Sequence, residues 1–214
     1  MHARRERLVI ASANPGKLRE FRELLAELPF AVVGQGELGI TGAQETGSSF
    51  LDNALLKARH AAKAAGAAAI ADDSGLEVDA LDGAPGIRSA RYSGEGADDA
   101  ANNARLLLAV KAAPAHRRTA RYRCVLVFVA GESDPLPLTA EGVWEGRILD
   151  SPRGTGGFGY DPYFWLPELN MTAAELSPSE KNRRSHRGMA MRALREQLMA
   201  RREPVPAHMP VPGP

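Results

Sequence analysis

The sequence predicts a protein of the α/β class, and two observations carry this prediction. Strand-like and helix-like segments alternate through the first half of the chain, as in folds where helices cover a sheet. The apolar run of residues 8–11 is followed by a turn and then by apolar residues at helical spacing. The chain has 214 residues, which is long enough to bury one core. We expect a single α/β domain over residues 1–201 and a Pro-rich disordered tail over residues 202–214.

The first unit of the chain predicts a strand, a tight loop and a helix. Residues 8–11 are short and β-branched enough for a buried strand, and the small residues of 12–16 make the turn. A single apolar stripe predicts the following helix, and its members are Leu18, Phe21, Leu24, Leu25 and Leu28. In α/β folds, a loop that joins a strand to a helix N-terminus is a place where anions are held.

Lys17 stands at the exit of this loop. The P-loop motif is excluded, because it requires Gly and then Ser or Thr at the positions of Ala11 and Leu18. From this stretch alone, Lys17 is a phosphate-facing lysine of another kind or a solvated residue in the first helical turn.

The middle of the chain continues the alternation. Residues 30–35 predict a short strand, and a Gly-rich loop over residues 39–49 carries Glu45. Residues 50–66 form a strong helix candidate that stops at its final glycine. Residues 68–71 then predict an apolar strand that breaks into acidic residues.

The second half predicts a helix, a strand pair and a final helix. Residues 97–113 have helical spacing, and residues 119–130 and 136–149 alternate like long strands that pair antiparallel. The last helix covers residues 185–202.

Composition excludes several classes of protein. With 27 basic and 26 acidic side chains, the chain lacks the broad positive surface of a typical nucleic-acid binder. Its one cysteine, Cys124, lies in an apolar run, which predicts a buried thiol in a reducing compartment. No segment approaches the roughly 20 apolar residues of a membrane span. We expect a cytoplasmic protein with no membrane and no nucleic-acid partner.

Acidic residues supply the first candidate site. Asp72 and Asp73 follow an apolar strand, and alternation along a strand lets only one of them point into a given site. A carboxylate there, followed by Ser74, suits a hard-cation ligand or a general base, or an ordinary turn. Glu45 is a second carboxylate, and two carboxylates with several waters commonly hold Mg²⁺ beside substrate phosphates.

Two further stretches are candidates. Residues 154–162, GTGGFGYDP, match a dinucleotide-binding glycine pattern, but no helix opening follows, so that interpretation is excluded. The stretch either presents Phe158 and Tyr160 to a planar base or forms a hairpin with its aromatics in the core. Residues 179–188, SEKNRRSHRG, are a basic cluster that offers donors to carbonyl or phosphate oxygens, or simply a solvated charged run.

Together these stretches resemble the inosine and xanthosine triphosphate pyrophosphatases. The resemblance spans roughly residues 8–200, and its motifs occur in the family's order: SANPGK, ETGSSFLDNALLKA, ADDSGLEVDALDGAPGIRSARYSG, GTGGFGYDP, AAEL and SHRG. It implies an elongated mixed sheet, two lobes around a central cleft, and a homodimer. It also implies hydrolysis of ITP, dITP and XTP to the monophosphate and pyrophosphate with Mg²⁺.

The resemblance also implies roles for individual residues. Asp73 would accept the proton of the attacking water, with Glu45 as its metal-site partner. Ser12, Asn14 and Lys17 would hold the triphosphate, within a binding loop that also contains Ala13, Pro15 and Gly16. The remaining substrate-binding residues would be Lys57, Ser74, Phe158, Gly159, Tyr160, Asp161, Lys181, His186 and Arg187.

Two rival functions stay open at this point. One is a pyrophosphatase for modified pyrimidine or other nucleotides, which the same phosphate-binding residues would support. The other is a non-catalytic nucleotide- or RNA-binding module. The near-zero net charge and the carboxylates Glu45 and Asp73 argue against the second rival, because they would not favour an RNA backbone.

Overall fold

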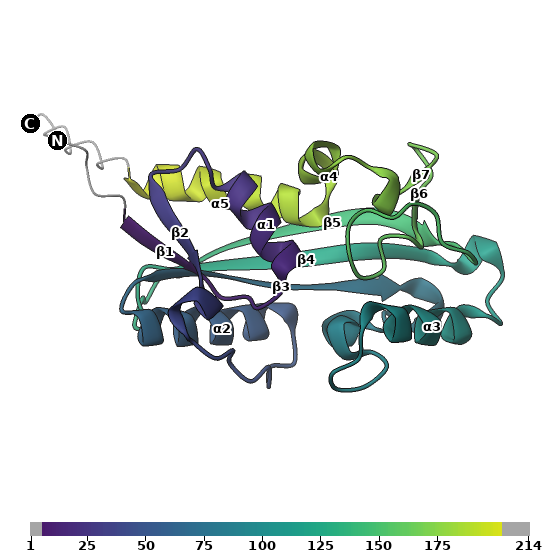
Figure 1. The fold of residues 1–214 in the computed structure, drawn as a ribbon, viewed down its shortest axis with the longest axis horizontal. Helices are drawn as coiled ribbons and strands as arrows, with labels where there is room; N and C mark the ends of the chain where they lie inside the picture. The colour runs from purple at the N-terminus through teal and green to yellow at the C-terminus, as the bar shows by residue number, and fades with distance from the viewer. Residues whose placement is uncertain (1–5, 203–214) are drawn as a thin grey trace, which may run out of the picture.

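The protein is built on one mixed sheet with helices on both faces (Figure 1), as seen in a computed structural model that describes residues 6–202. The sheet has seven strands in the order β2-β1-β3-β4-β5-β6-β7. The strands are β1 (Glu6–Ile10), β2 (Phe30–Gly34), β3 (Ala68–Val78), β4 (Thr119–Val129), β5 (Leu138–Ile148), β6 (Phe164–Leu166) and β7 (Met171–Thr172). The predicted α/β class is confirmed.

Within residues 6–202, five α-helices cover the sheet. They are α1 (Pro15–Leu24), α2 (Phe50–Ala65), α3 (Asp99–Val110), α4 (Pro178–Arg184) and α5 (His186–Arg202). Figure 1 shows α1, α4 and α5 on one face and α2 and α3 one after the other on the opposite face. Shorter 3-10 helices join these elements: η1 (Gln35–Leu38), η2 (Asp79–Leu81), η3 (Gly86–Arg91), η4 (Ala115–Arg117) and η5 (Ala173–Glu175).

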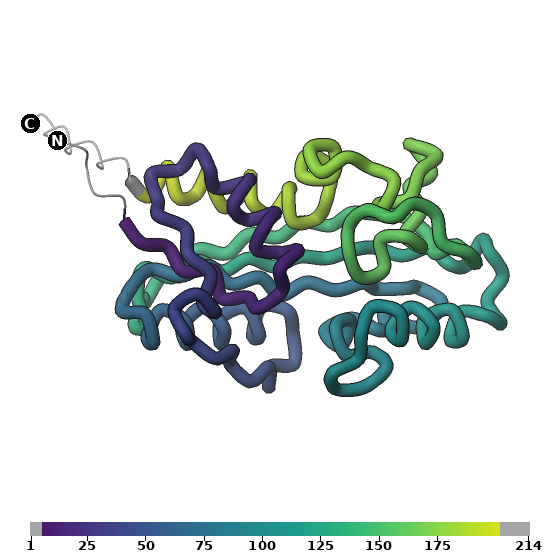
Figure 2. The backbone as a smooth tube through the Cα atoms, in the orientation of Figure 1, coloured from purple at the N-terminus to yellow at the C-terminus, as the bar shows by residue number. Residues whose placement is uncertain are grey.

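Because side chains alternate along each strand, apolar residues pack against helices on both faces of the sheet. Leu8 and Ile10 of β1 pack with α1 and α5, whereas Val9 between them packs against the alanines of α2. A third cluster, which includes Leu76, Leu106 and Phe164, fills the far end of the sheet beside α3. The long strands β3, β4 and β5 extend along the length of the molecule (Figure 2). They connect the part of the sheet covered by α2 with the part covered by α3.

The prediction that the strand beginning at residue 68 ends at its acidic residues is wrong, because β3 continues to Val78. Strand β1 pairs with β3 in parallel only as far as Ile10 opposite Ile70. Strand β4, in contrast, pairs antiparallel with β3 from Ala69 through Val78. Because this ladder satisfies the main-chain groups on one side of β3, the strand continues through Asp72 and Asp73. The two carboxylates lie in mid-strand, just past the end of β1.

Local capping explains where the helices begin and end. Helix α1 starts with Pro15, and the Asn14 side chain accepts hydrogen bonds from two main-chain N–H groups of the first turn. Helix α2 is capped by Ser49 and ends at Gly66, whose φ of 57° lies in the left-handed region. The predicted final helix is confirmed as α5, and α4 is a separate helix because Ser185 between them is extended.

The predicted strand pair over 119–130 and 136–149 is confirmed as the antiparallel pair of β4 and β5. Most of the predicted tail, residues 203–214, lies outside the described residues, and α5 includes Arg202. None of the helices in the described part of the chain has the length and apolar character of a membrane span.

Candidate functional site

The loop between β1 and α1 organises one side of the site. The Asn14 Oδ1 atom accepts from the main-chain N–H groups of Gly16 at 2.8 Å and of Lys17 at 3.1 Å. The Ser12 Oγ atom accepts from the main-chain N–H of Asn14 at 3.2 Å. These bonds fix the turn and direct the Lys17 ammonium to the Asp72 carboxylate. Since an ammonium carries three donors, Lys17 can bind both Asp72 and a phosphate oxygen.

Asp72 is the centre of a buried charge cluster on the α1 and α5 face of the sheet. Its carboxylate accepts from Arg187 Nε at 2.8 Å, from Ser74 Oγ at 2.7 Å and from Cys124 Sγ at 3.3 Å. Burial alone would raise the pKa of Asp72, but Arg187 and Lys17 outweigh it and hold that pKa well below its usual range. Asp72 is therefore a permanent anion that orients cations.

Asp73 points to the opposite face, as alternation along the strand predicts. Its carboxylate accepts from Lys57 Nζ of α2 at 2.6 Å and from Asn53 Nδ2 at 3.4 Å. Burial raises the pKa of Asp73, and the nearby Lys57 ammonium offsets this only in part. A carboxylate with a raised pKa is a better proton acceptor than an ordinary aspartate.

Glu45 reaches the same lysine from the Gly-rich loop. Its Oε1 atom lies 2.8 Å from Lys57 Nζ, and its Oε2 atom accepts from Arg91 of η3 at 2.8 Å. Burial would raise the pKa of Glu45, but Lys57 and Arg91 lower it overall. Asp73 and Glu45 thus converge on one cationic atom, although they come from a strand and a distant loop.

The convergence of Asp73 and Glu45 on Lys57 shows whether these residues fit a metal ion. Among residues 6–202, no group of three or more His, Cys, Asp or Glu side chains is placed to hold a metal alone. Mg²⁺ in nucleotide enzymes uses one or two carboxylates together with waters and substrate phosphates. The hard oxygen donors of Asp73 and Glu45, already aimed at one positive charge, fit that incomplete donor set.

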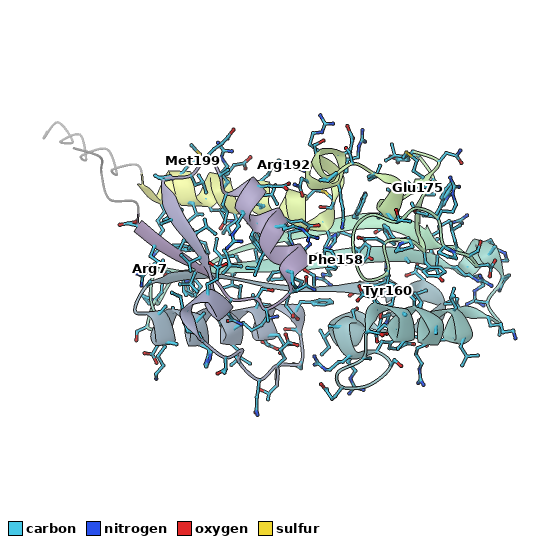
Figure 3. All side chains as sticks on the ribbon, in the orientation of Figure 1. Arg7, Phe158, Tyr160, Glu175, Arg192 and Met199 are labelled. Carbon is cyan, nitrogen blue, oxygen red and sulfur yellow. The ribbon has the colours of Figure 1, made fainter. Side chains whose placement is uncertain are left out.

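A cavity of about 270 Å³ is lined by Lys17, Ser74 and Arg187, three residues whose side chains contact Asp72. Most of the predicted substrate-binding residues line it, and these are Asn14, Lys17, Ser74, Phe158, Gly159, Tyr160, Asp161, Lys181, His186 and Arg187. In Figure 3 the side chains of Phe158 and Tyr160 lie in the middle of the molecule, between the N-terminal end of α1 and α3. The structure therefore brings these segments together from both halves of the chain.

The two aromatic residues of the glycine-rich stretch differ in their surroundings. Tyr160 lies in the core, as one interpretation predicts, and Phe158 lies at the cavity, as the other predicts. Tyr160 is buried in the core, and its hydroxyl donates to the Ser89 carbonyl at 2.8 Å. Phe158 is half-buried at the cavity, with Lys181 Nζ 4.6 Å from the ring centroid. A Cβ atom on Gly16 would come within 2.6 Å of Phe158 Cδ1, so the ring rests on the start of α1. Of these two aromatics, Phe158 is thus the more exposed ring and offers the surface on which a planar group could stack.

The last two helices supply buried cations. The Lys181 Nζ atom lies 2.6 Å from Asp161 Oδ2 and 3.1 Å from Glu20 Oε1. His186 stacks on Tyr122 with the ring centroids 4.7 Å apart, and its Nδ1 atom has no hydrogen-bond partner among the described residues. Burial and the neighbouring Arg187 hold the pKa of His186 well below its usual value, so this imidazole is neutral at pH 7.

The remaining predicted residues are not among those that line the cavity. Asp73, Glu45 and Lys57 form the carboxylate–lysine cluster, and Ser12 and Gly16 contact Asn14 or Phe158 as described above. Ala13 and Pro15 belong to the same turn, in which Pro15 is the first residue of α1.

Several partners of the site were missed from the sequence. Glu20 contacts both Lys181 and Arg187, and Arg91 contacts Glu45. One signal was available for Glu20, because it follows Lys17 at a spacing of three and thus lies on the same helical face. Asn53 had a similar signal, because it lies four residues before Lys57 on α2, whereas Arg91 had none.

A larger groove of about 790 Å³ lies at the amino end of β1. Its lining is mainly alanine and phenylalanine, with Leu198 and Arg201 from α5. It does not gather the opposed carboxylates and cations described above. We therefore assign the functional site to the smaller cavity and the adjoining cluster.

The fold and this site define an α/β protein with a cavity lined by cations and aromatic rings, and with two carboxylates, Asp73 and Glu45, that converge on Lys57. The chain belongs to the Ham1 family, whose model matches residues 8–197. The resemblance drawn from the sequence motifs is confirmed.

Individual relatives agree with this assignment. The chain is 55% identical over 195 residues to the dITP/XTP pyrophosphatase of Thioalkalivibrio sulfidiphilus, covering 91% of this chain and 100% of the relative. It is 56% identical over 196 residues to the dITP/XTP pyrophosphatase of Methylococcus capsulatus, covering 92% and 98%. A solved HAM1 protein from Coxiella burnetii has a TM-score of 0.83 at 48% identity, covering 91% of this chain and 99% of its own. The Ham1 protein of Staphylococcus aureus has a TM-score of 0.80 at 40% identity, covering 92% and 100%.

Proposed function

We propose that this protein hydrolyses ITP, dITP and XTP to the nucleoside monophosphate and pyrophosphate. Relatives at about 55% identity carry the name dITP/XTP pyrophosphatase and match along nearly their whole length. The observation that carries the proposal is that Asp72 and Asp73, adjacent in β3, bind different cations. Asp73 lies with Lys57 and Glu45, while Asp72 holds Lys17 and Arg187 beside a cavity that contains an aromatic ring.

The carboxylate–lysine cluster supports attack of water on the α-phosphorus. Asp73 is the proposed general base, because burial raises its pKa and it lies among groups that attract phosphate. Asp73 and Glu45 would hold Mg²⁺, which when bound would neutralise charge on the phosphate oxygens. Lys17 and Lys57 would bind the triphosphate, and Ser12, Asn14 and Ser74 would border it. The leaving group is pyrophosphate, and the proton of the attacking water passes to Asp73.

Base selection is the proposed task of the cavity. A purine ring would stack on Phe158, and the polar groups of Asp161, Lys181 and Arg187 would read its edge. Hypoxanthine and xanthine carry a carbonyl at the purine 6-position, where adenine carries an amino donor. A buried donor facing that amino group would be left unpaired, and such a mismatch costs roughly 10⁴-fold or more in kcat/KM. Guanine shares the 6-carbonyl, so the expected rejection of GTP needs another cause, such as crowding of its 2-amino group.

Two further properties belong to this proposal. We expect a homodimer, which sedimentation of the purified protein will test. We also expect the enzyme to act in the cytoplasm, where nucleotide pools are maintained, and its single buried cysteine fits a reducing compartment.

Product identification tests the proposed reaction. The purified protein is incubated with ITP, XTP, ATP and GTP in Mg²⁺, and pyrophosphate and orthophosphate are measured separately. We expect pyrophosphate from ITP and XTP and little product from ATP or GTP. Orthophosphate would overturn attack at the α-phosphorus. Turnover only of modified pyrimidine nucleotides, or salt-sensitive RNA binding without turnover, would replace the proposed function.

A further inference from the structure

Helix α3 holds the glycine-rich loop at one residue, Gly159. The Asp99 Oδ2 atom accepts from the Gly159 main-chain N–H at 2.7 Å. The Asn103 side-chain amide donates to the Gly159 carbonyl oxygen at 2.9 Å. Asp99 and Asn103 are four residues apart, so they lie on the same face of α3. Both main-chain polar groups of Gly159 are therefore held by the same helix.

We call the two hydrogen bonds from Asp99 and Asn103 to Gly159 the clamp, and other features of α3 and of the loop support it. The Asn103 amide also donates to the main-chain carbonyl of Asp99 at 2.8 Å, which ties the two clamping residues to each other. Asn103 is 9% exposed, so its hydrogen bonds are shielded from water. Gly159 has a φ of 63°, a left-handed conformation that favours glycine, although its Cβ position is open. The main chain at this point is shaped for the two bonds.

Phe158 directly precedes the clamped glycine. Its own main-chain N–H donates to Asp161 Oδ2 at 2.9 Å, so two successive N–H groups of the loop are fixed. With its main chain held on both sides, the Phe158 ring has little freedom beyond its side-chain torsions. The ring rests on Gly16 at the start of α1, and it lines the same cavity as Asp99 of α3.

We infer that Asp99 and Asn103 are positioning residues for recognition of the purine base. They act through Gly159 and set the place of the Phe158 ring, on which the base stacks. The inference rests on the proposed function, because it takes Phe158 as the stacking surface. A binding pocket gains affinity when its contact groups are held in place before the ligand arrives. Loss of the clamp therefore weakens binding of the base and leaves phosphate chemistry unchanged.

Asp99→Ala and Asn103→Asp test the clamp. The first removes the acceptor for Gly159 N–H, and the second replaces a donor by an oxygen that faces the Gly159 carbonyl. Because one hydrogen bond is worth about 1 kcal/mol, we expect KM for ITP to rise about fivefold in each variant. We expect kcat to stay within about twofold of the parent value. Asp99→Asn keeps an acceptor oxygen and is expected to restore the parent KM.

Two controls separate positioning from general destabilisation. Asp98 caps the same helix through the Ala101 N–H at 2.8 Å. Asp98→Ala is expected to lower the unfolding temperature without changing KM, since it leaves the Gly159 contacts in place. Tripolyphosphate, which has no base, is used as a competitive inhibitor. Its inhibition constant is expected to be the same for the parent and for both clamp variants.

The results distinguish failure of the clamp from failure of the proposed function. An unchanged KM for ITP in folded Asp99→Ala and Asn103→Asp proteins would overturn the clamp. A parallel rise in KM for ITP and in the tripolyphosphate inhibition constant would also overturn it, because the defect would not be confined to the base. If the parent protein does not hydrolyse ITP, the proposed function fails, and binding of IMP measured by calorimetry then tests the clamp instead.

Discussion

Replacing Asp72 by Asn tests whether this carboxylate stabilises the fold by neutralising a buried arginine. The side chain of Asp72 is 0% exposed and that of Arg187 is 2% exposed, with Oδ2 and Nε 2.8 Å apart. Asp72→Asn keeps the shape of the side chain but removes its charge. Arg187 then retains Glu20 as its carboxylate partner, and that side chain is itself 13% exposed. The guanidinium remains buried with less compensation.

The expected loss follows from the burial of the pair. Removing one partner of a buried ion pair costs about 3–5 kcal/mol of unfolding free energy. For a domain of this size, each 1 kcal/mol lowers the unfolding temperature by roughly 2–4 °C, so a fall of about 6–20 °C is expected. Circular dichroism during urea and thermal unfolding measures both quantities.

A matched control lies on the same helix as Arg187. Arg195 of α5 pairs with Glu27 at 2.8 Å, but these side chains are 38% and 74% exposed. Glu27→Gln is therefore expected to cost less than about 1 kcal/mol. If Asp72→Asn unfolds within about 1 kcal/mol of the parent, the proposed stabilising role of this buried pair is wrong.

Four further predictions concern the functional site. Asp73→Asn is expected to lower kcat for ITP by about 10²-fold or more while leaving the fold intact, and near-parent turnover would remove Asp73 from the role of base. Because burial raises the pKa of Asp73, its carboxyl in the metal-free protein should bind a proton at a higher pH than an ordinary aspartate, and an NMR titration of the metal-free protein that finds a lowered pKa contradicts this expectation. Chelation by EDTA should stop turnover and added Mg²⁺ should restore it, whereas undiminished hydrolysis in EDTA would exclude a required metal. Gly16→Ala should raise KM for ITP because its Cβ would lie 2.6 Å from Phe158 Cδ1, while Gly36→Ala, with open space around it, should match the parent in the same assay.

Much of the fold was accessible from local patterns. The helix over residues 50–65 has a serine cap, a regular apolar face and a terminal glycine, all of which are encoded within the segment. The pairing of β4 with β5 follows from two long alternating runs close together in the chain. The extent of β3 was not accessible, because β4 stabilises its acidic half from a distant part of the sequence.

The site was accessible in part for a similar reason. The motifs identified Asp73, Lys17 and Phe158 as candidates, but they did not show that Asp72 is the anion that holds the cations. Its partner Arg187 is 115 residues away, and no spacing rule connects the two. The contacts of Asp99 and Asn103 with Gly159 were hidden in the same way, since they join segments 60 and 56 residues apart.

The adjacency of Asp72 and Asp73 also bears on how β3 finds its alignment during folding. A slip of one residue in a strand turns every side chain to the opposite face of the sheet. Such a slip would bring Ala71 or Asp73 to Arg187, and Asp72 or Ser74 to Lys57. In either direction one buried cation would lose its carboxylate partner in β3, which disfavours both misaligned sheets. The same two carboxylates that divide the site between the faces of the sheet thus specify a single alignment of its central strand.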